Sequence, residues 1–305
     1  MGTGGTKYVV VLAGDHLYRM NYMDFLQYHR ATNADITLAV QPVSAELAPA
    51  FGILKRNLDG QILSFTEKPK RTELDGLKSI PDSDKPYMAS MGIYVFPTEL
   101  LFKILEQPGD DFGKDIIPQA LSKQRVMGYV FEDYWADIGT IGSFYEVNIE
   151  MAAAERPFDL YAPKSPIYTR PRFLTPSEVR KSQLDQVLIA DGCKITEATI
   201  NNSVIGLRSF ISPAALINGS VIMGADYYET EDDRARNKQA GRPDVGIGPG
   251  SVIESGIVDK NARIGRNVHI RHLPDRPDTE TNDWVVREGM VIVLKNSVIA
   301  DDTVI

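Results

Sequence analysis

The sequence predicts an α/β domain followed by a parallel β-helix. Strand and helix signals alternate from residue 7 to about residue 155, which is typical of an α/β fold. Five prolines then interrupt residues 157–183, and beyond them aliphatic residues recur at every sixth position. Because 305 residues exceed one ordinary core, we divide the chain into a first domain, 1–156, a proline-rich linker, 157–183, and a regulatory and assembly coil, 184–305.

The first domain combines apolar runs with amphipathic segments. We expect strands at Val9–Leu12, Ile36–Val40 and Met91–Phe96, a hairpin over 51–65 that turns at Asp59-Gly60, and helices at 23–32, 98–106, 116–121 and 141–154. The unbroken run at Val9–Leu12 is typical of a central strand covered on both faces, so we expect a mainly parallel sheet. In the helix at 98–106, Thr98 is the candidate N-cap, and Leu101, Ile104 and Leu105 are expected to point inward.

A hexapeptide period predicts the coil. Positions six apart carry aliphatic or small residues in three runs, which are Val187, Cys193, Thr199, Ile205, Ile211 and Ile217; Val252, Val258, Ile264 and Ile270; and Ile292, Val298 and Val304. In a parallel β-helix such residues stack inside flat rungs of three short strands. The period breaks at about 226–244 and 272–288, where charged residues predict loops that leave the coil.

Composition narrows the class of protein. The formal net charge is −8, so nothing favours nucleic acid or an anionic membrane as a partner. The segment Met1–Thr6 is glycine-rich rather than basic and apolar, and no apolar run is long enough to cross a bilayer, so we expect neither a signal peptide nor a spanning segment. The single cysteine, Cys193, excludes an intrachain disulfide framework and fits a reducing cytoplasm.

Two aspartates follow predicted strands. Asp15 ends a buried run, and Asp137 lies between a strand and a helix. Ligands of open α/β sheets bind at the carboxyl ends of strands, and Mg²⁺ takes one or two carboxylates together with phosphate and water oxygens. The two aspartates could therefore hold one Mg²⁺. A strand-ending turn at Asp15, and helix capping by Asp137 or Thr140, are the structural alternatives.

Two further motifs carry polar side chains at strands. The hairpin ends in Phe-Thr-Glu-Lys-Pro, where Lys68 is a candidate phosphate clamp and Glu67 a candidate acceptor for sugar hydroxyls. The run Ala-Ser-Met-Gly-Ile-Tyr adds the hydroxyl of Ser90 and a glycine, Gly92, that allows a ligand to approach the strand closely. An exposed Glu-Lys pair is the structural alternative for the first motif.

A third motif, Asp-Phe-Gly-Lys-Asp, opens a helix at Asp111. Capping of that helix by the Asp111 carboxylate explains the motif structurally. A functional interpretation places Lys114 beside a sugar phosphate instead. Each motif fits an ordinary structural role when taken alone, and their order along the chain is the more specific signal.

That order resembles the glucose-1-phosphate adenylyltransferase family, the ADP-glucose pyrophosphorylases. Gly-Asp-His, Glu-Lys-Pro, Ser-Met-Gly-Ile-Tyr, Asp-Phe-Gly-Lys-Asp and Trp-x-Asp-Ile-Gly-Thr follow one another before the hexapeptide coil. The resemblance runs from Tyr8 to Ile305, and Tyr227–Thr230 and Asp259–Gly265 bring it closer to the cyanobacterial and plant type. It implies a partial Rossmann-like, glycosyltransferase-A-like nucleotidyltransferase domain followed by a left-handed coil.

The resemblance also implies a reaction and roles for residues. Members of the family join glucose 1-phosphate and ATP into ADP-glucose and pyrophosphate for glycogen or starch synthesis, by attack of the sugar phosphate on the α-phosphorus of ATP. The implied ligands of the catalytic Mg²⁺ are Asp15 and Asp137, and the implied substrate-binding residues are Glu67, Lys68, Ser90, Gly92, Tyr94, Asp111, Lys114 and Trp135. Lys260 and Lys295 match the lysines that bind a phosphorylated activator, and a homo- or hetero-tetramer is implied.

The coil by itself leaves two functions open. One is acyl transfer by a trimer, which usually needs a histidine base on a coil face, and His269 and His272 are the candidates. The other is a regulatory and assembly module attached to an enzyme. A histidine near a loop is more often an ordinary surface residue, so we favour the second function.

The sequence departs from the family at its beginning. The family's glycine-rich loop with its essential arginine, which wraps the ATP phosphates, is not found, and Met1–Thr6 lacks the Gly-Lys-Ser/Thr of a P-loop. About a hundred residues of the nucleotide half are expected upstream, so we expect this polypeptide alone to have little or no pyrophosphorylase activity. A non-catalytic regulatory or binding subunit, and a nucleotidyltransferase that uses GTP or UTP, are the alternatives.

Overall fold

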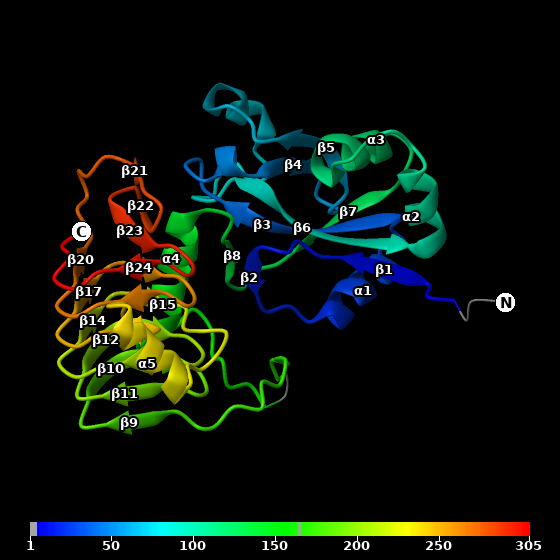
Figure 1. Cartoon of the computed structure of the whole chain (residues 1–305). Coiled ribbons are helices and arrows are strands. Elements are labelled where there is room, and N and C mark those ends of the chain that lie inside the picture. Colours follow the sequence, from blue (N-terminus) through cyan, green and yellow to red (C-terminus); the bar gives the residue numbers. More distant parts are fainter. Residues whose placement is uncertain (1–4, 164–165) are drawn as a thin grey trace. The chain divides into compact units, whose positions relative to one another are not determined.

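Two bodies of different architecture follow one another along the chain in this computed structural model, which describes residues 5–163 and 166–305 (Figure 1). The first unit is Met1–Trp135, and the second is Ala136–Ile305. A mixed sheet with helices forms the first unit, and short parallel strands wound into a coil form most of the second. Within the described residues, no helix has the length and apolarity that a membrane span requires.

The first unit is built on a sheet with the strand order β5-β4-β6-β3-β7, to which β1 adds by pairing with β6. The strands are β1 (Tyr8–Val11), β2 (His16–Tyr18), β3 (Ile36–Val43), β4 (Gly52–Arg56), β5 (Ile62–Glu67), β6 (Tyr87–Pro97) and β7 (Val126–Val130), and β8 (Trp135–Asp137) begins at the last residue of this unit and continues into the second. The helices are α1 (Tyr22–Ala31), α2 (Thr98–Leu105), α3 (Ile117–Leu121), the 3-10 helices η1 (Ala48–Ala50) and η2 (Arg71–Leu77), and the π-helix η3 (Phe112–Ile116).

The expectation of a mainly parallel sheet is wrong. Strand β6 runs antiparallel to β1, β3 and β4, and β4 and β5 form the expected antiparallel hairpin, whereas β3 and β7 are parallel. Parallel neighbours need a long crossover, usually a helix, but the chain between β3 and β6 contains the hairpin and short 3-10 turns instead. Strand β1 pairs along β6, and Val10 within it is 36% exposed rather than covered on both faces.

Alternate residues of β3 and β6 supply two cores, one on each face of the sheet. Ile36, Leu38 and Phe96 pack toward α2 and α3, whereas Ala39 and Ile93 pack toward Phe25 of α1. This alternation is the period of two that a strand imposes on its side chains. The sheet is therefore buried on both faces at its centre, as its continuous apolar strands predict.

The helices begin and end close to the predicted residues, with one error of capping. Helix α1 is capped by the Asn21 side chain, which accepts a hydrogen bond from the Met23 amide at 3.1 Å. Thr98 is the first residue of α2 rather than its N-cap, and its Oγ1 donates to the Thr6 carbonyl at 2.6 Å. Leu105, expected to point inward, is 50% exposed, because α2 ends there.

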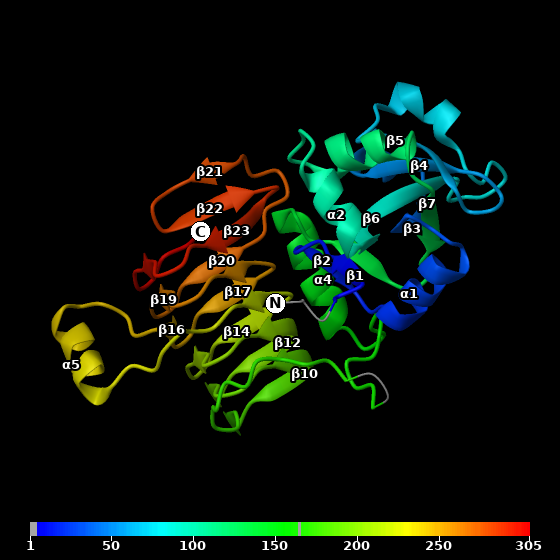
Figure 2. The ribbon, with the colours of Figure 1, turned by 90° about the vertical axis from the view of Figure 1, so that its right-hand side faces the viewer.

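The second unit winds its strands into three flat faces, and Figure 2 shows the strands of one face stacked in the order β10, β12, β14, β17 and β20. One face has the order β24-β19-β16-β13-β11-β9, and the other two meet along the bent strands β10 and β12. The strands are β9 (Glu178–Arg180), β10 (Gln183–Ile189), β11 (Lys194–Thr196), β12 (Thr199–Ile205), β13 (Phe210–Ile211), β14 (Leu216–Asn218), β15 (Val221–Ile222), β16 (Gly246–Ile247), β17 (Val252–Glu254), β18 (Ile257–Val258), β19 (Arg263–Ile264), β20 (His269–Arg271), β21 (Thr279–Glu280), β22 (Trp284–Arg287), β23 (Met290–Val293) and β24 (Val298–Ile299).

The rungs of the coil are shorter than three strict hexapeptides. Thr199 pairs with Leu216, and Val252 pairs with His269, each 17 residues later in the chain. Such a rung contains one interval of five, so inward positions drift from a strict period of six. Ile200 is fully buried while Thr199, predicted to point inward, is only half-buried.

The last predicted run of inward residues is wrong by one position. Val293, Ile299 and Ile305 are buried in the coil core, whereas Val298 is 38% and Val304 76% exposed. In a strand, a shift of one residue moves the side chain to the opposite face. The hairpin formed by β22 and β23 precedes this run, and it resets the register that the period had established.

Both predicted excursions leave the regular coil, but neither is a simple loop. Residues 226–244 contain helix α5 (Glu231–Gln239), whose cap Thr230 accepts a hydrogen bond from the Asp233 amide, and Figure 2 shows α5 standing off the coil. Residues 272–288 contain β21 and β22, which extend the sheet as antiparallel strands. The predicted linker also ends earlier than residue 183, because β9 already pairs with β11 from Glu178 onward.

Helix α4 (Ile141–Ala152) packs against the coil rather than the sheet of the first unit. Its Phe144, Tyr145 and Ile149 cover the outward side chains of Val221 and Ile257 on one coil face. The compact units accordingly divide at Trp135, before α4, whereas the predicted boundary at residue 156 lies after it. The apolar face of an amphipathic helix can pack on any matching apolar surface. The hexapeptide period reports only the inward residues of the coil, so it does not predict the outward apolar surface that α4 covers.

Candidate functional site

Four of the predicted substrate-binding residues converge in the first unit at Tyr94 of β6. Burial raises the pKa of the Tyr94 phenol, a hydrogen bond with Ser90 opposes that rise, and the nearby carboxylates of Glu67 and Asp111 add to it. The phenol is therefore protonated at neutral pH and can donate a hydrogen bond. These polar groups come from β5, β6 and the start of η3, so the sheet brings together residues that lie far apart in the sequence.

The ring of Tyr94 is held by an aromatic neighbour that the sequence did not indicate. Phe112, the first residue of η3, stacks on it with ring centroids 5.3 Å apart and an angle of 23° between the rings. Asp111 places Phe112 there, because its carboxylate caps the helix by accepting hydrogen bonds from the amides of Gly113 at 2.7 Å and Lys114 at 2.8 Å. The capping interpretation of Asp111 is thus confirmed.

The Glu67 carboxylate lies against backbone that has no room for side chains. A Cβ at Gly113 would lie 3.0 Å from Glu67 Oε2, and a Cβ at Gly52 would lie 2.8 Å from it. Glycine at both positions therefore allows the carboxylate to lie between β4 and η3. The motif Asp-Phe-Gly-Lys-Asp contributes its glycine to this arrangement as well as its capping aspartate.

Gly92 lies opposite the loop that carries Asp15. Its φ of +64° is left-handed, and a Cβ there would lie 3.2 Å from the Ala13 Cβ and 3.5 Å from the His16 ring. His16 donates from Nδ1 to the Met91 carbonyl at 2.8 Å, which ties the loop to β6. The ring of Trp135 packs edge-on against the His16 ring with centroids 5.4 Å apart.

The two predicted phosphate-binding lysines are both exposed. Lys68 follows β5 in a left-handed conformation with a φ of +44°, and its amide donates to the Phe51 carbonyl at 3.1 Å. A non-glycine residue in this conformation is strained. Lys114 lies in η3, directly after the residues that hold Tyr94 and Glu67.

The two aspartates predicted to bind Mg²⁺ belong to different units. Asp15 is in the first unit, where its side chain is 62% exposed and its Oδ1 lies 3.6 Å from His16 Nε2. Asp137 is in the second unit, where its Oδ1 accepts a hydrogen bond from the Gly139 amide at 2.8 Å. Thr140, not Asp137, caps α4, since its hydroxyl accepts a hydrogen bond from the Ser143 amide.

Comparison with protein-family models assigns both parts of the chain. Residues 2–154 match the family described as Nucleotidyl transferase, and residues 172–304 match the GLGC left-handed parallel β-helix domain. The chain belongs to the nucleotidyl transferase family. Its fold is accordingly a nucleotidyl transferase domain followed by a left-handed parallel β-helix, as the sequence predicts.

The β-helix of this nucleotidyl transferase brings Lys260 and Lys295 to one carboxylate. Lys260 Nζ lies 3.0 Å from Oδ1 of Asp226, and Lys295 Nζ lies 3.0 Å from Oδ2 of the same residue. Asn261 Nδ2 donates to Oδ2 at 3.2 Å. Hydrogen bonds from Lys260, Lys295 and Asn261 hold the pKa of the Asp226 carboxyl well below its usual range.

Asp226 was not among the predicted residues, although the spacing of its partners in the sequence points to this cluster. The two lysines are 35 residues apart, and so are Asn261 and Asn296, whose side chains hydrogen-bond at 3.0 Å. That separation equals one rung of the coil plus the β21–β22 excursion, so these residues occupy the same place on successive rungs. Asp226 lies 34 residues before Lys260, in the segment between β15 and α5.

Proposed function

We propose that this protein is a sugar-1-phosphate nucleotidyltransferase that forms ADP-glucose and pyrophosphate from ATP and glucose 1-phosphate, in glycogen or starch synthesis. The observation that carries the proposal is the convergence of Glu67, Ser90 and Tyr94 in a nucleotidyl transferase domain. A carboxylate, a hydroxyl and a protonated phenol together offer the acceptors and donors that a sugar needs. The GLGC coil supports the ADP-glucose family over other sugar nucleotidyltransferases.

In the proposed site, the residues of this chain position the sugar phosphate. Glu67 accepts hydrogen bonds from sugar hydroxyls, Tyr94 and Ser90 orient the ring, and the Lys68 ammonium pairs with the phosphate. Positioning and charge neutralisation supply most of the rate in phosphoryl-type transfers, because the protein forms no covalent bond to the substrate. Gly92, Asp111, Lys114 and Trp135 shape the pocket around these groups.

Mg²⁺ is the cofactor that the proposal requires, with Asp15 and Asp137 as its carboxylate ligands. The exposed Asp15 carboxylate, held at the end of a loop tied to β6, offers the hard oxygen donor that Mg²⁺ prefers. When bound, the ion neutralises charge on the nucleotide phosphates.

The pair of lysines on the coil is the proposed activator site. Lys260 and Lys295 present two ammonium groups at one place, and Asp226 keeps them there when no other anion does. A phosphorylated metabolite is the proposed ligand, since a phosphate can replace the carboxylate between the two lysines. Assembly into a homo- or hetero-tetramer through the coil completes the proposal.

A pyrophosphate-release assay with glucose 1-phosphate, Mg²⁺ and either ATP, GTP or UTP tests the reaction, on this polypeptide and on any longer product of its gene. In whichever form shows turnover, we expect ADP-glucose as the product, faster turnover with ATP than with GTP or UTP, and loss of turnover in Asp137→Asn. The neighbouring Asp133→Asn is the matched control and should retain turnover. A preference for GTP or UTP, or full turnover by Asp137→Asn, would contradict the proposal.

A further inference from the structure

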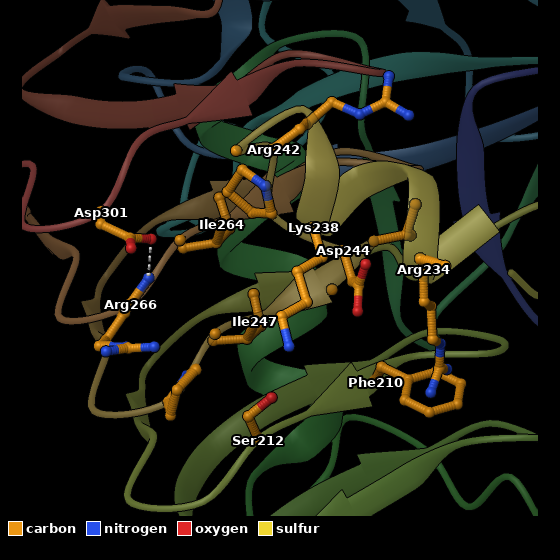
Figure 3. A pocket seen from close by; sticks show the side chains of 18 residues that line it. Phe210, Ser212, Arg234, Lys238, Arg242, Asp244, Ile247, Ile264, Arg266 and Asp301 are labelled. Carbon is orange, nitrogen blue, oxygen red and sulfur yellow. Dashed lines mark hydrogen bonds between the residues drawn. The ribbon is translucent and has the colours of Figure 1, made fainter. Parts of the chain in front are cut away.

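A large cavity on the coil lies outside every residue that the proposed function uses. It measures about 680 Å³ and lies within the second unit, between the α5 excursion and the face formed by β13, β16 and β19. Figure 3 shows Ser212, Ile247 and Ile264 of the coil on one side of it, and Arg234 and Lys238 of α5 on the other. Pockets that bury small organic ligands have roughly 300–1,000 Å³ of volume, so this cavity is large enough for one.

The lining is cationic in a chain whose net charge is negative. Four cationic side chains, Arg234, Lys238, Arg242 and Arg266, line the cavity together with Asp244 and Asp301, while the whole chain carries a formal charge of −8. Both acidic groups already accept hydrogen bonds, Asp244 from Asn237 at 2.8 Å and Asp301 from the Arg266 amide at 2.8 Å.

Three of the cations have no carboxylate partner. Arg242 is engaged, since its guanidinium donates to the Asn237 side chain. Lys238, Arg266 and Arg234 form no ion pair with any residue in 5–163 or 166–305. Figure 3 shows the Lys238 ammonium reaching between Ile247 and Ser212, with Arg266 on one side and Arg234 on the other. Unpaired cations that converge on a cavity create a local positive potential that attracts an anion.

Arg234 also carries a buried donor without an acceptor. Its guanidinium carbon lies 4.8 Å from the centroid of the Phe210 ring, and its Nε is inaccessible to water and has no hydrogen-bond partner in the described chain. A buried donor left without a partner costs roughly 1–3 kcal/mol, so such groups in native proteins usually have a reason. An anion in the cavity would draw the guanidinium toward it and remove this cost.

The excursion that forms the wall is fixed to the coil, so the cavity is a built feature. Glu229 pairs with Arg263 at 2.7 Å, accepts from Asn237 at 2.8 Å, and accepts from the Val245 amide at 2.9 Å. Both partners of this ion pair are almost fully buried. Asn237, on the inner side of α5, is 1% exposed, which anchors the helix that carries Arg234 and Lys238.

We propose that this cavity is a second anion site, which binds a small organic phosphate. Its phosphoryl group lies between the Lys238 ammonium and the Arg266 or Arg234 guanidinium, with the Ser212 hydroxyl beside it. Its carbon skeleton lies against Pro243, Val245 and Pro249, apolar lining residues that are not fully buried. The site is independent of the proposed reaction and of the Lys260–Lys295 pair, because it shares no residue with either.

The test is calorimetric titration of the whole chain with phenyl phosphate, inorganic phosphate and phenol. Phenyl phosphate joins a phosphoryl group to a flat apolar body, and the other two probes each supply one half. We expect phenyl phosphate to bind at least tenfold more tightly than inorganic phosphate or phenol. Lys238→Ala combined with Arg266→Ala should weaken that binding at least tenfold. Both side chains are exposed, so the variant should fold, and circular dichroism is the check that it does.

Matched variants separate this site from the other basic groups. Arg236→Ala on the same helix removes a guanidinium that pairs with Asp233 outside the cavity, and it should leave binding unchanged. Lys260→Ala combined with Lys295→Ala removes the other proposed phosphate site of the coil, and phenyl phosphate should still bind to the cavity in that variant. The proposal would be overturned if the folded Lys238/Arg266 variant bound phenyl phosphate as tightly as wild type does. It would also be overturned if only the Lys260/Lys295 variant lost this binding. Inorganic phosphate binding as tightly as phenyl phosphate would overturn the assignment of an organic ligand.

Discussion

Lys260 and Lys295 contact opposite oxygens of one carboxylate, that of Asp226, with both distances at 3.0 Å. The three side chains are between 38% and 50% exposed, so the pairs are accessible to an incoming anion. Each ion pair of this exposure contributes about 0–1 kcal/mol to stability. Asp226 therefore holds the two lysines together, and a ligand that displaces its carboxylate loses little free energy by breaking the two ion pairs.

The first prediction concerns that displacement. Asp226→Asn keeps the shape of the side chain and removes the competing charge, so it should strengthen phosphate binding at Lys260 and Lys295 by roughly three- to tenfold, the equivalent of about 1 kcal/mol. Titration with inorganic phosphate measures this change, and the Lys260→Ala/Lys295→Ala variant serves as the blank for binding at other sites. Weaker binding by Asp226→Asn would show that the carboxylate orients the lysines for the ligand rather than competing with it.

A second prediction concerns the buried ion pair of Glu229 with Arg263. Glu229→Ala leaves Arg263, whose side chain is 10% exposed, without its partner, and breaking a buried pair in this way costs roughly 3–5 kcal/mol. Urea unfolding should show this loss of stability. Glu231→Ala, at an exposed position in the first turn of α5, is the control and should cost about 0.3–1 kcal/mol. Similar losses in the two variants would refute the structural role of the pair.

The same pair predicts a pH dependence. Burial alone would raise the pKa of the Glu229 carboxyl, but hydrogen bonds from Val245, Asn237 and Arg263 outweigh it and lower the pKa. Since the folded-state pKa is the lower one, the stabilisation is complete above the unfolded pKa, near 4.3, and is lost as pH falls through the folded value. The stability difference between wild type and Glu229→Gln should therefore shrink between pH 6 and pH 3. A difference that stays constant over that range would contradict this account.

Gly92 provides a prediction about the loop that carries Asp15. Gly92→Ala forces a side chain into a left-handed conformation and against the Ala13 Cβ, so it should destabilise the first unit by about 1–2 kcal/mol. Gly14→Ala is the matched control, because a Cβ at Gly14 meets no atom within 4 Å. Thermal unfolding of both variants measures the difference. Equal melting temperatures would show that the loop yields to the added Cβ.

Much of the fold could be predicted because local periods report burial directly. The strands of the sheet, its hairpin at Asp59-Gly60 and the inward residues Ile205, Ile211 and Ile217 follow from the alternation and the period of six. Strand direction could not be predicted in this way, because an apolar run has the same period in parallel and antiparallel sheets. Val298 and Val304 were predicted to point inward, but the β22–β23 hairpin shifts the register by one residue. The hexapeptide period does not encode the length of that hairpin.

Within the candidate site, the sequence indicated residues inside motifs but not the partners that those residues contact. Glu67, Ser90 and Asp111 lie near Tyr94 in the structure, and the binding roles of all four residues stay predictions. Phe112 and Asp226 were missed, because a stacking ring and a bridging carboxylate are defined by distances across the fold. The cavity beside α5 was missed for the same reason, since its cations lie in a segment predicted only as a charged loop.

Lys68 allows a test of phosphate binding that leaves the backbone intact. Lys68→Gly removes the ammonium and relieves the left-handed strain at the same time, so stability should be kept or raised by about 1 kcal/mol. Glucose 1-phosphate binding should nevertheless fall about tenfold, the effect of losing roughly 1.4 kcal/mol from one charged contact. Lys103→Ala, an exposed lysine of α2, should bind as wild type does.

Titration of the chain with glucose 1-phosphate, followed by calorimetry, tests the central claim most directly. The account predicts saturable binding that is weakened at least tenfold by Glu67→Gln and also weakened by Tyr94→Phe, each of which removes one polar group from the cluster at Tyr94. Glucose and inorganic phosphate should each bind more weakly than the intact sugar phosphate. No saturable binding, or binding that Glu67→Gln and Tyr94→Phe leave unchanged, would contradict the assignment of this cluster to the sugar phosphate.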